Sequence, residues 1–337
     1  MNNTFVRQVL PIILAIGLLW YVLKDVPLNE LSAQFRQANF RWLGVAGIII
    51  GAYHIARAAR WQLTLQALGY QPSLFRTTIA LLAGSMASMI IPGAGELTRC
   101  GTLQRTDGVP IAQGLGSVVA ERVIDLLTLV LLIGLTLFFE FKRVGQFITD
   151  LFSPLLSRMT SSGQSGIILI VLSGISILLI IFFYWLLRNP TFRQHPLSKR
   201  LGTIALNMGK GFIAIQKLKS PILFIGLTIA SYALAFLSTY TLFFASSQTL
   251  SLPPSAALTI LTVSSLGGIA VPTQGGVGTY HFLVSRVLML YGMDETASVV
   301  MATFLHAAQT GFSLLFSSIS FLIVPILVRQ KAKQVDV

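Results

Sequence analysis

Long apolar runs without charged side chains constrain this chain more than any other feature. The run from Gly166 to Leu187 contains no Asp, Glu, Lys or Arg and is long enough to cross a bilayer as a helix. Charged residues make up 10% of the chain and its mean hydropathy is +0.77, whereas about a quarter of the residues of a soluble domain are charged. We therefore predict an all-α polytopic membrane protein.

The apolar runs group into two predicted membrane repeats, each with full spans and one shorter, re-entrant helical hairpin. The first repeat, residues 1–141, has spans at 9–23, 42–56 and 115–141 and a re-entrant hairpin at 77–111. The second repeat, residues 166–328, has spans at 166–187, 221–245 and 296–328 and a re-entrant hairpin at 256–291. The remaining segments are an external connection at 142–165, a loop at 188–220 and a tail at 329–337.

The distribution of basic residues sets the predicted orientation. The loop 188–220 has seven Lys or Arg and no acid, so we expect it on the cytoplasmic face of the cell inner (plasma) membrane, together with both termini. If every apolar run crossed once, the basic segments could not share one side, and treating the two hairpins as re-entrant removes this conflict. Three crossings per repeat then make the second repeat inverted, a common transporter plan. Arg57 and Arg60 beside Trp61 are interpreted as an interfacial anchor that closes the second span.

The net charge of +13 also raises the possibility of a nucleic-acid partner. The basic residues lie in short loops between apolar runs and do not form a face interleaved with aromatic residues, so we expect no nucleic acid. The expected partner is a membrane phospholipid or another lipid. The oligomeric state is not determined by the sequence.

Two stretches share one pattern: an apolar run, a proline, glycines and then polar side chains. They are Met89 to Arg99 and Val271 to His281. A helix that breaks inside the hydrocarbon layer leaves backbone groups unpaired, so the break must be buried in protein or lie beside a water-filled cavity. The exposed amides at the N-terminus of the following half-helix attract anions. These stretches and the charged start of the following span provide the candidate substrate-binding residues: Pro92, Gly93, Gly95, Glu96, Arg99, Glu121, Arg122, Asp125, Pro272, Gly275, Gly276, Gly278, His281 and Arg286.

Charged side chains in these membrane segments allow two interpretations. Arg99, Arg105 and Arg122 are candidates to hold a phosphate, because a guanidinium offers forked donors. The acids Glu96, Glu121 and Asp125 would contact a cationic headgroup or carry a proton. The alternative is a structural ion-pair network that only fixes the first hairpin to the next helix.

Catalytic and cofactor motifs were sought and none was found. No His pair has metal-ligand spacing, no Ser, His and Asp form a nucleophile elbow, and the glycines after Pro272 lack the βαβ context of a dinucleotide site. Cys100 is the only cysteine, which excludes an intrachain disulfide. His281 and His306 are weighed as functional or packing residues. We predict no cofactor and no enzymatic activity.

The chain resembles the transmembrane region of the lysylphosphatidylglycerol synthase family, also called flippase-like proteins. The resemblance is carried by Pro92-Gly-Ala-Gly-Glu96 with Arg99, by Glu121-Arg122-x-x-Asp125, and by Pro272 with Gly275-Gly276-x-Gly278. It implies a multi-span protein related to the part that moves aminoacylated phosphatidylglycerol between leaflets, without the aminoacyl-transfer domain.

The chain departs from the family pattern at two positions. His281 stands where an acidic residue is often found and Gln274 where a proline is often found, which weakens the case for a cationic headgroup. Our leading hypothesis is a passive or ion-coupled lipid flippase for a phospholipid or another anionic amphipathic lipid. The alternatives are a membrane enzyme acting on a lipid headgroup and a scaffold that docks a partner through the loop 188–220.

Overall fold

The computed structural model describes residues 28–91, 93–161, 218, 220–270 and 274–335, and every regular element in these ranges is helical. The elements are α2 (Leu28–Gln37), α3 (Phe40–Ala67), α4 (Leu74–Ile90), α5 (Ala94–Asp107), α6 (Ile111–Ser161), α10 (Pro221–Phe243), α11 (Pro254–Ala270), the short 3₁₀ helix η1 (Gln274–Gly276), α12 (Thr279–Leu290) and α13 (Glu295–Val335). The predicted spans 9–23 and 166–187, most of the loop 188–220, Pro92 and Pro272 lie outside the described residues.

Four of the described helices are long and apolar enough to cross a membrane: Phe40–Ala67, Ile111–Arg143, Pro221–Phe243 and Glu295–Lys331. The helices α4 and α11 are apolar but shorter. In α6 the backbone leaves helical geometry at Glu140, close to the end of its apolar part. The prediction of a multi-pass helical membrane protein is thus confirmed, while the re-entrant character of the two hairpins stays a prediction.

Two helices extend well beyond the predicted spans: α6 continues past 141 to Ser161, through most of the predicted connection 142–165, and α3 continues past 56 to Ala67. This helix continues through Arg57, Arg60 and Trp61 to Ala67, and Arg60 and Trp61 are only 2% and 0% exposed. The interpretation of these residues as an interfacial anchor is therefore wrong. Two carboxylates on α6 compensate the charge of Arg60, so this side chain does not need to reach water.

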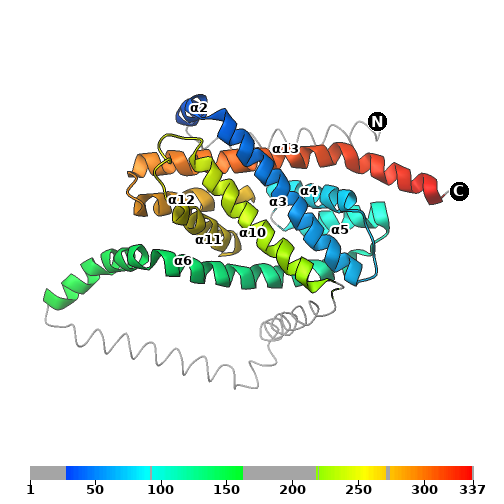
Figure 1. The fold of residues 1–337 in the computed structure, drawn as a ribbon, viewed down its shortest axis with the longest axis horizontal. Helices are drawn as coiled ribbons and strands as arrows, with labels where there is room; N and C mark the ends of the chain where they lie inside the picture. Colours follow the sequence, from blue (N-terminus) through cyan, green and yellow to red (C-terminus); the bar gives the residue numbers. More distant parts are fainter. Residues whose placement is uncertain (1–27, 92, 162–217, 219, 271–273, 336–337) are drawn as a thin grey trace, which may run out of the picture.

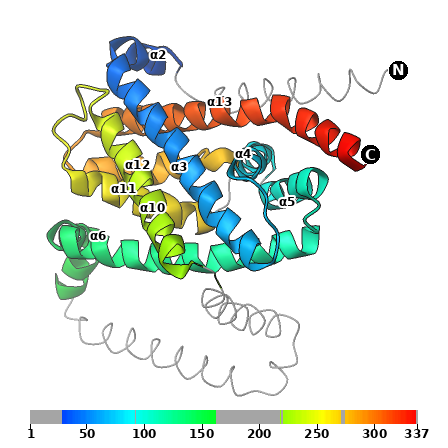
Figure 2. The ribbon, with the colours of Figure 1, turned by 45° about the vertical axis from the view of Figure 1, so that its right-hand side comes forward.

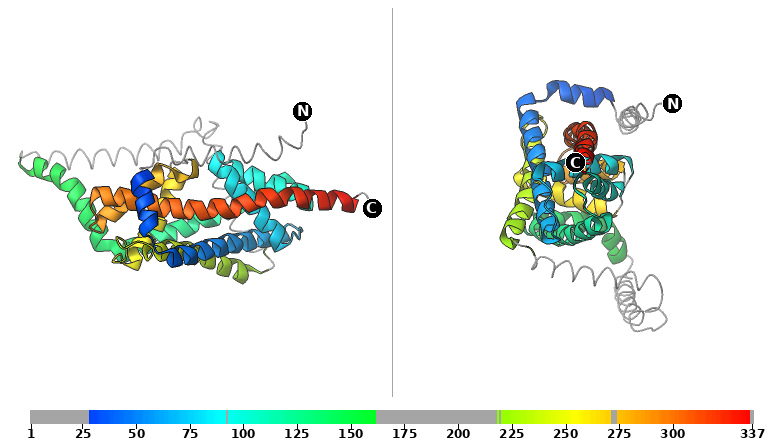
Figure 3. Two further views of the ribbon diagram at one scale, coloured as in Figure 1. Left: turned by 90° about the horizontal axis from the view of Figure 1, so that it is seen from above. Right: turned by 90° about the vertical axis from the view of Figure 1, so that its right-hand side faces the viewer.

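The helices form a layered bundle in which the two hairpins occupy the centre. In Figure 1, α3 and α10 lie side by side and cross in front of α6 and α13, which run along opposite edges. In Figure 2 the α11–α12 hairpin passes behind α10 and α3, and the α4–α5 hairpin lies to the right of α3. The end-on view in Figure 3 shows the same hairpins between α13 and α6.

The two halves of the described chain repeat one order of elements. A long helix, a short hairpin and another long helix occur as α3, α4–α5, α6 and again as α10, α11–α12, α13. Both α4 and α11 have 17 residues. Each hairpin also packs against the last helix of the other half, α4 against α13 and α11 against α6. This exchange of contacts supports the predicted repeat, whose inversion across the membrane stays a prediction.

The first hairpin closes through two glycines that face each other. A Cβ built on Gly84 would lie 2.6 Å from the carbonyl oxygen of Gly95, and a Cβ on Gly95 would collide with the carbonyl of Gly84 and with Ser88. Since small residues let helix backbones approach closely, this pair sets the spacing of α4 and α5. At the open end of the hairpin, Arg76 pairs with Asp107 at 3.2 Å.

The second hairpin is held by the larger apolar core. The fully buried side chains of Leu242, Ile260, Leu288 and Phe304 come from α10, α11, α12 and α13 and pack in one cluster. Its open end lies beside the kink of α6, where the guanidinium of Arg143 sits 4.2 Å from the centre of the Tyr291 ring. Both hairpins therefore have contacts that fix their open ends.

Candidate functional site

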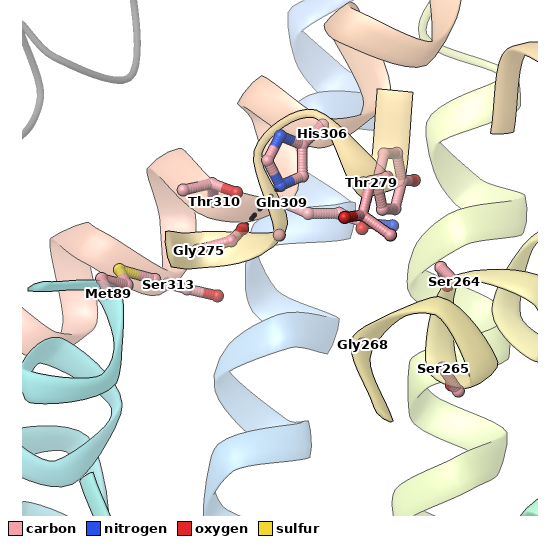
Figure 4. Close-up of a pocket in the computed structure, with 12 residues that line it drawn as sticks. Met89, Ser264, Ser265, Gly268, Gly275, Thr279, His306, Gln309, Thr310 and Ser313 are labelled. Carbon is pink, nitrogen blue, oxygen red and sulfur yellow. Dashed lines mark hydrogen bonds between the residues drawn. The ribbon is translucent and has the colours of Figure 1, made fainter. Parts of the chain in front are cut away.

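A pocket of about 320 Å³ lies at the inner ends of the two hairpins. Figure 4 shows side chains from four helices and the glycine turn surrounding it. The lining residues are Met89 of α4, Ser264, Ser265 and Gly268 of α11, Gly275 and Gly276 of η1, Thr279 and Tyr280 of α12, and His306, Gln309, Thr310 and Ser313 of α13. The α13 residues fall near the middle of the membrane-length segment Glu295–Lys331, so the pocket is far from both helix ends.

Described residues of both proline-glycine stretches line this pocket. Met89, at the end of α4, is the first residue of one stretch, and η1 of the other stretch contacts α4. A shared substrate site at this place stays a prediction. Gly275 and Gly276 adopt φ values of 58° and 80°, which side chains with a Cβ rarely adopt. The glycines therefore allow the chain to turn tightly at the pocket wall.

A group of three aromatic rings forms the wall next to this turn. Nε2 of His306 donates a hydrogen bond to the carbonyl of Gly275 at 2.9 Å, as the dashed line in Figure 4 marks. The His306 ring stacks on Tyr280 at 4.6 Å and meets the edge of His281 at 4.8 Å. Nδ1 of His281 accepts a hydrogen bond from the backbone N–H of Gly278 at 3.3 Å. These contacts hold the glycine turn against α13.

The described residues that line the pocket combine polar groups with a larger apolar surface, and none of them is Asp, Glu, Lys or Arg. Its polar groups are hydroxyls, the amide of Gln309 and the imidazole of His306. Nε2 of Gln309 donates to Oγ1 of Thr239 on α10 at 3.0 Å, which fixes the orientation of the amide. Among the residues that the structure describes, no group of three or more His, Cys, Asp or Glu is placed to hold a metal ion.

The charged candidates form a separate, mostly buried cluster between α3, α5 and α6. Nη2 of Arg60 lies 2.7 Å from Oδ1 of Asp125, and Nε of Arg60 lies 3.6 Å from Oε1 of Glu121. Nη1 of Arg99 donates to Oε2 of Glu121 at 2.9 Å, and its guanidinium lies 4.5 Å from the centre of the Trp61 ring. The cluster joins the first hairpin to both neighbouring long helices, as the alternative interpretation of these charges proposed.

The outer part of this cluster is more accessible. Nη2 of Arg122, a side chain that is 53% exposed, donates to Oε1 of Glu96 at 2.6 Å. Arg122 also lies 3.7 Å from Asp125. Arg105 is exposed on α5, and Arg286 lies 3.9 Å from Glu295 on the outer side of the second hairpin. A role of these residues in binding substrate stays a prediction.

The predicted site residues thus separate into two groups. Gly275 and Gly276 line the pocket and His281 packs behind it. Of the charged residues, Arg286 lies beside Glu295, and the others belong to the ion-pair cluster: Glu96, Arg99, Glu121, Arg122 and Asp125. Gly93 and Gly278 precede the first residues of α5 and α12, and Gly95 packs against α4.

Sequence reasoning missed most of the pocket, including Ser264, Ser265, Gln309, Thr310 and Ser313, as well as the buried Arg60. A detectable pattern was present on α13. Residues 306, 309, 310 and 313 follow the i, i+3, i+4, i+7 spacing of one helix face, so they form a polar stripe on an otherwise apolar helix.

The fold and the pocket define the class of this molecule: it is a multi-pass helical membrane protein with a pocket lined by several of its helices. The model of the family "Lysylphosphatidylglycerol synthase TM region" matches residues 8–317, and the chain belongs to this family. The resemblance found in the motif residues is thereby confirmed. No curated protein and no solved structure matches the chain.

Proposed function

We propose that this protein moves a phospholipid or another anionic amphipathic lipid between the two leaflets of the membrane. Its family supports a function connected with membrane lipids. Passage of a lipid requires a polar place for the headgroup inside the apolar part of the bundle, because an unpaired polar group in hydrocarbon costs several kcal/mol.

The position and lining of the pocket carry this proposal. It lies near the middle of α13, and its walls come from both hairpins, α4 and α11–α12. Transporters built from two repeats commonly bind substrate at the repeat interface near the bilayer midplane. A headgroup bound here would be about halfway between the leaflets while its acyl chains stay in lipid.

The ion-pair cluster has a supporting role in this proposal. Its pairs connect α5 to α6 and α6 to α3, so they fix the first hairpin while the pocket end of α4 contacts η1. Arg122 and Glu96 are the accessible members and are the ones able to contact a passing headgroup. The cytoplasmic orientation of the termini belongs to the same proposal and follows from the basic loop 188–220.

Leaflet exchange of fluorescent lipids in proteoliposomes tests the function directly. The purified full chain is reconstituted, and reduction of the outer-leaflet label by dithionite reports how fast inner-leaflet lipid appears outside. We expect faster exchange than in protein-free vesicles for at least one lipid of a panel of anionic and neutral lipids. Rates equal to those of empty vesicles for the whole panel would overturn the proposal.

A pair of variants on one helix links the exchange to the pocket. Ser313→Leu places a larger apolar side chain in the pocket, whereas Ser318→Leu makes the same change at an exposed position one and a half turns further along α13. We expect Ser313→Leu to reduce exchange to near the empty-vesicle rate and Ser318→Leu to leave it unchanged. Equal rates in the two variants would place the path elsewhere.

A further inference from the structure

The lining of the pocket restricts the chemical class of headgroup that it can accept. Resting on the proposed transport function, we infer that the pocket accepts an uncharged, hydroxyl-bearing headgroup terminus, such as glycerol or a sugar, and excludes an ammonium group. The inference depends on which polar groups line the pocket and on how the nearby charges are already paired.

The groups that line the pocket match a polyol. Ser264, Ser265, Thr310 and Ser313 each bring a hydroxyl from α11 or α13, and Gln309 brings an amide. A hydroxyl both donates and accepts, and an amide offers both functions at separate atoms. The hydroxyls of Ser264 and Ser265 donate to the carbonyl of Leu261 and therefore offer acceptors to a ligand, whereas those of Thr310 and Ser313 can donate or accept. Such a set can pair with the hydroxyls of a glycerol or sugar, so it requires no fixed charge on the ligand.

An ammonium group would find no counter-charge in the same space. None of the lining side chains is acidic, and the nearest imidazole, His306, can add positive charge but never negative charge. Its Nε2 already donates to the carbonyl of Gly275, which leaves that oxygen less available to a cation. Transfer of an unpaired ion from water into such a site costs several kcal/mol, so a cationic headgroup is rejected.

The acids of the ion-pair cluster are already neutralised by arginines. Glu121 lies against both Arg99 and Arg60, Asp125 against Arg60, and Glu96 against Arg122. A lysyl or ethanolamine headgroup would have to displace one of these guanidinium groups to gain a carboxylate. That exchange breaks one ion pair to make another and provides no net attraction.

The described residues of the pocket wall also form no aromatic cage for a cation. Such cages need ring faces open to the ligand. The Tyr280 ring stacks on His306 at 4.6 Å with an interplanar angle of 24°, so one of its faces is covered by an imidazole. The described lining likewise holds no Lys or Arg to pair with a phosphate, so a headgroup without phosphate, such as that of a glycosyl diacylglycerol, suits the pocket best.

Four labelled lipids that differ in the headgroup test the inference in the exchange assay: monoglucosyl diacylglycerol, phosphatidylglycerol, phosphatidylethanolamine and lysyl-phosphatidylglycerol. We expect exchange of the first two to exceed that of the last two by at least about tenfold, the factor that corresponds to 1.4 kcal/mol of discrimination. Equal rates for all four would refute the selectivity while leaving the transport function standing. No exchange of any lipid would refute the transport function itself, and faster exchange of the two amines would reverse the inference.

A single carboxylate placed in the pocket should change this preference. Gln309→Glu keeps the side-chain size and gives an ammonium group a partner, and Gln104→Glu makes the same change at an exposed site on α5 as a control. We expect Gln309→Glu to raise the rate for phosphatidylethanolamine relative to phosphatidylglycerol by about tenfold, and Gln104→Glu to leave the ratio unchanged. An unchanged ratio in Gln309→Glu, with the variant folded and active on phosphatidylglycerol, would show that headgroups do not pass through this pocket.

Discussion

Arg99 and Glu121 form a buried ion pair in which Nη1 lies 2.9 Å from Oε2 and both side chains are about 5% exposed or less. Arg99 belongs to α5 of the first hairpin and Glu121 to α6. The pair therefore joins two consecutive helices that fold back against each other. The pair also contacts α3, because Arg99 lies over the ring of Trp61 and Glu121 lies beside Arg60.

Removal of Arg99 is expected to destabilise the fold. The substitution Arg99→Ala leaves Glu121 with only the more distant Arg60, and breaking one side of a buried ion pair typically costs about 3–5 kcal/mol. Thermal unfolding in detergent, followed by tryptophan fluorescence, should show a clear drop in Tm. Adding Glu121→Gln to the same chain should recover part of the loss, because it removes the uncompensated charge.

Arg105 provides the matched control for this experiment. It lies on the same helix, and its side chain is exposed. Arg105→Ala should change stability by no more than about 0.5 kcal/mol. If both arginine variants lost the same stability, the ion pair would not be what fixes the hairpin.

A methyl group on Gly95 should separate the two helices of the first hairpin. Gly95→Ala would bring its Cβ into the carbonyl of Gly84, which belongs to the backbone and cannot rotate away. Overpacking of this kind costs about 1–3 kcal/mol. Gly101→Ala is the control on the same helix, since nothing lies within 4 Å of its Cβ position, and it should stabilise by up to about 1 kcal/mol through helix propensity.

The measurement compares the unfolding temperatures of the two glycine variants with that of the unsubstituted protein. Unfolding temperatures in one detergent should rank Gly101→Ala at or above the unsubstituted protein and Gly95→Ala below it. The reverse order would mean that α4 and α5 are not in contact at this point.

Much of the fold could be predicted from the sequence because apolar length and charge are local properties. The start of α10 at residue 221 and the two short hairpins around Pro92 and Pro272 follow from where hydrophobic runs begin and stop. The end of α3 could not be predicted in this way. Arg57 and Arg60 resemble the end of a span, and only the position of Asp125 and Glu121 on another helix makes a buried arginine acceptable at that point.

The site was harder to predict because its residues are ordinary when considered singly. Ser264, Thr310 and Ser313 are common packing residues in membrane helices, and only the tertiary arrangement brings them to one cavity. The charged residues were easier to notice, and most of them are used to join helices. The charged residues of the predicted membrane segments therefore indicated which helices are joined around the candidate site better than they indicated the residues that line the pocket.

The thiol of Cys100 should be unreactive in the folded protein. It is 1% exposed, and its sulfur lies 3.0 Å from the position that a Cβ on Gly114 would take, in the contact between α5 and α6. Maleimide labelling should proceed only after denaturation, whereas a cysteine introduced by Ser32→Cys on the exposed face of α2 should label at once. Rapid labelling of Cys100 in the native protein would show that the hairpin opens from α6.

The hydrogen bond from His306 to the carbonyl of Gly275 should be needed for the shape of the pocket. His306→Phe keeps an aromatic ring against Tyr280 but removes the donor, and an unpaired buried carbonyl costs about 1–3 kcal/mol. His306→Gln retains a donor at a similar distance from the backbone. In the exchange assay we expect His306→Gln to keep a substantial part of the rate and His306→Phe to lose most of it, with both proteins eluting as single species in size exclusion. If the two variants lost the rate equally, the imidazole would contribute something other than this hydrogen bond; if neither lost it, the turn at Gly275 would not need α13 to form the pocket.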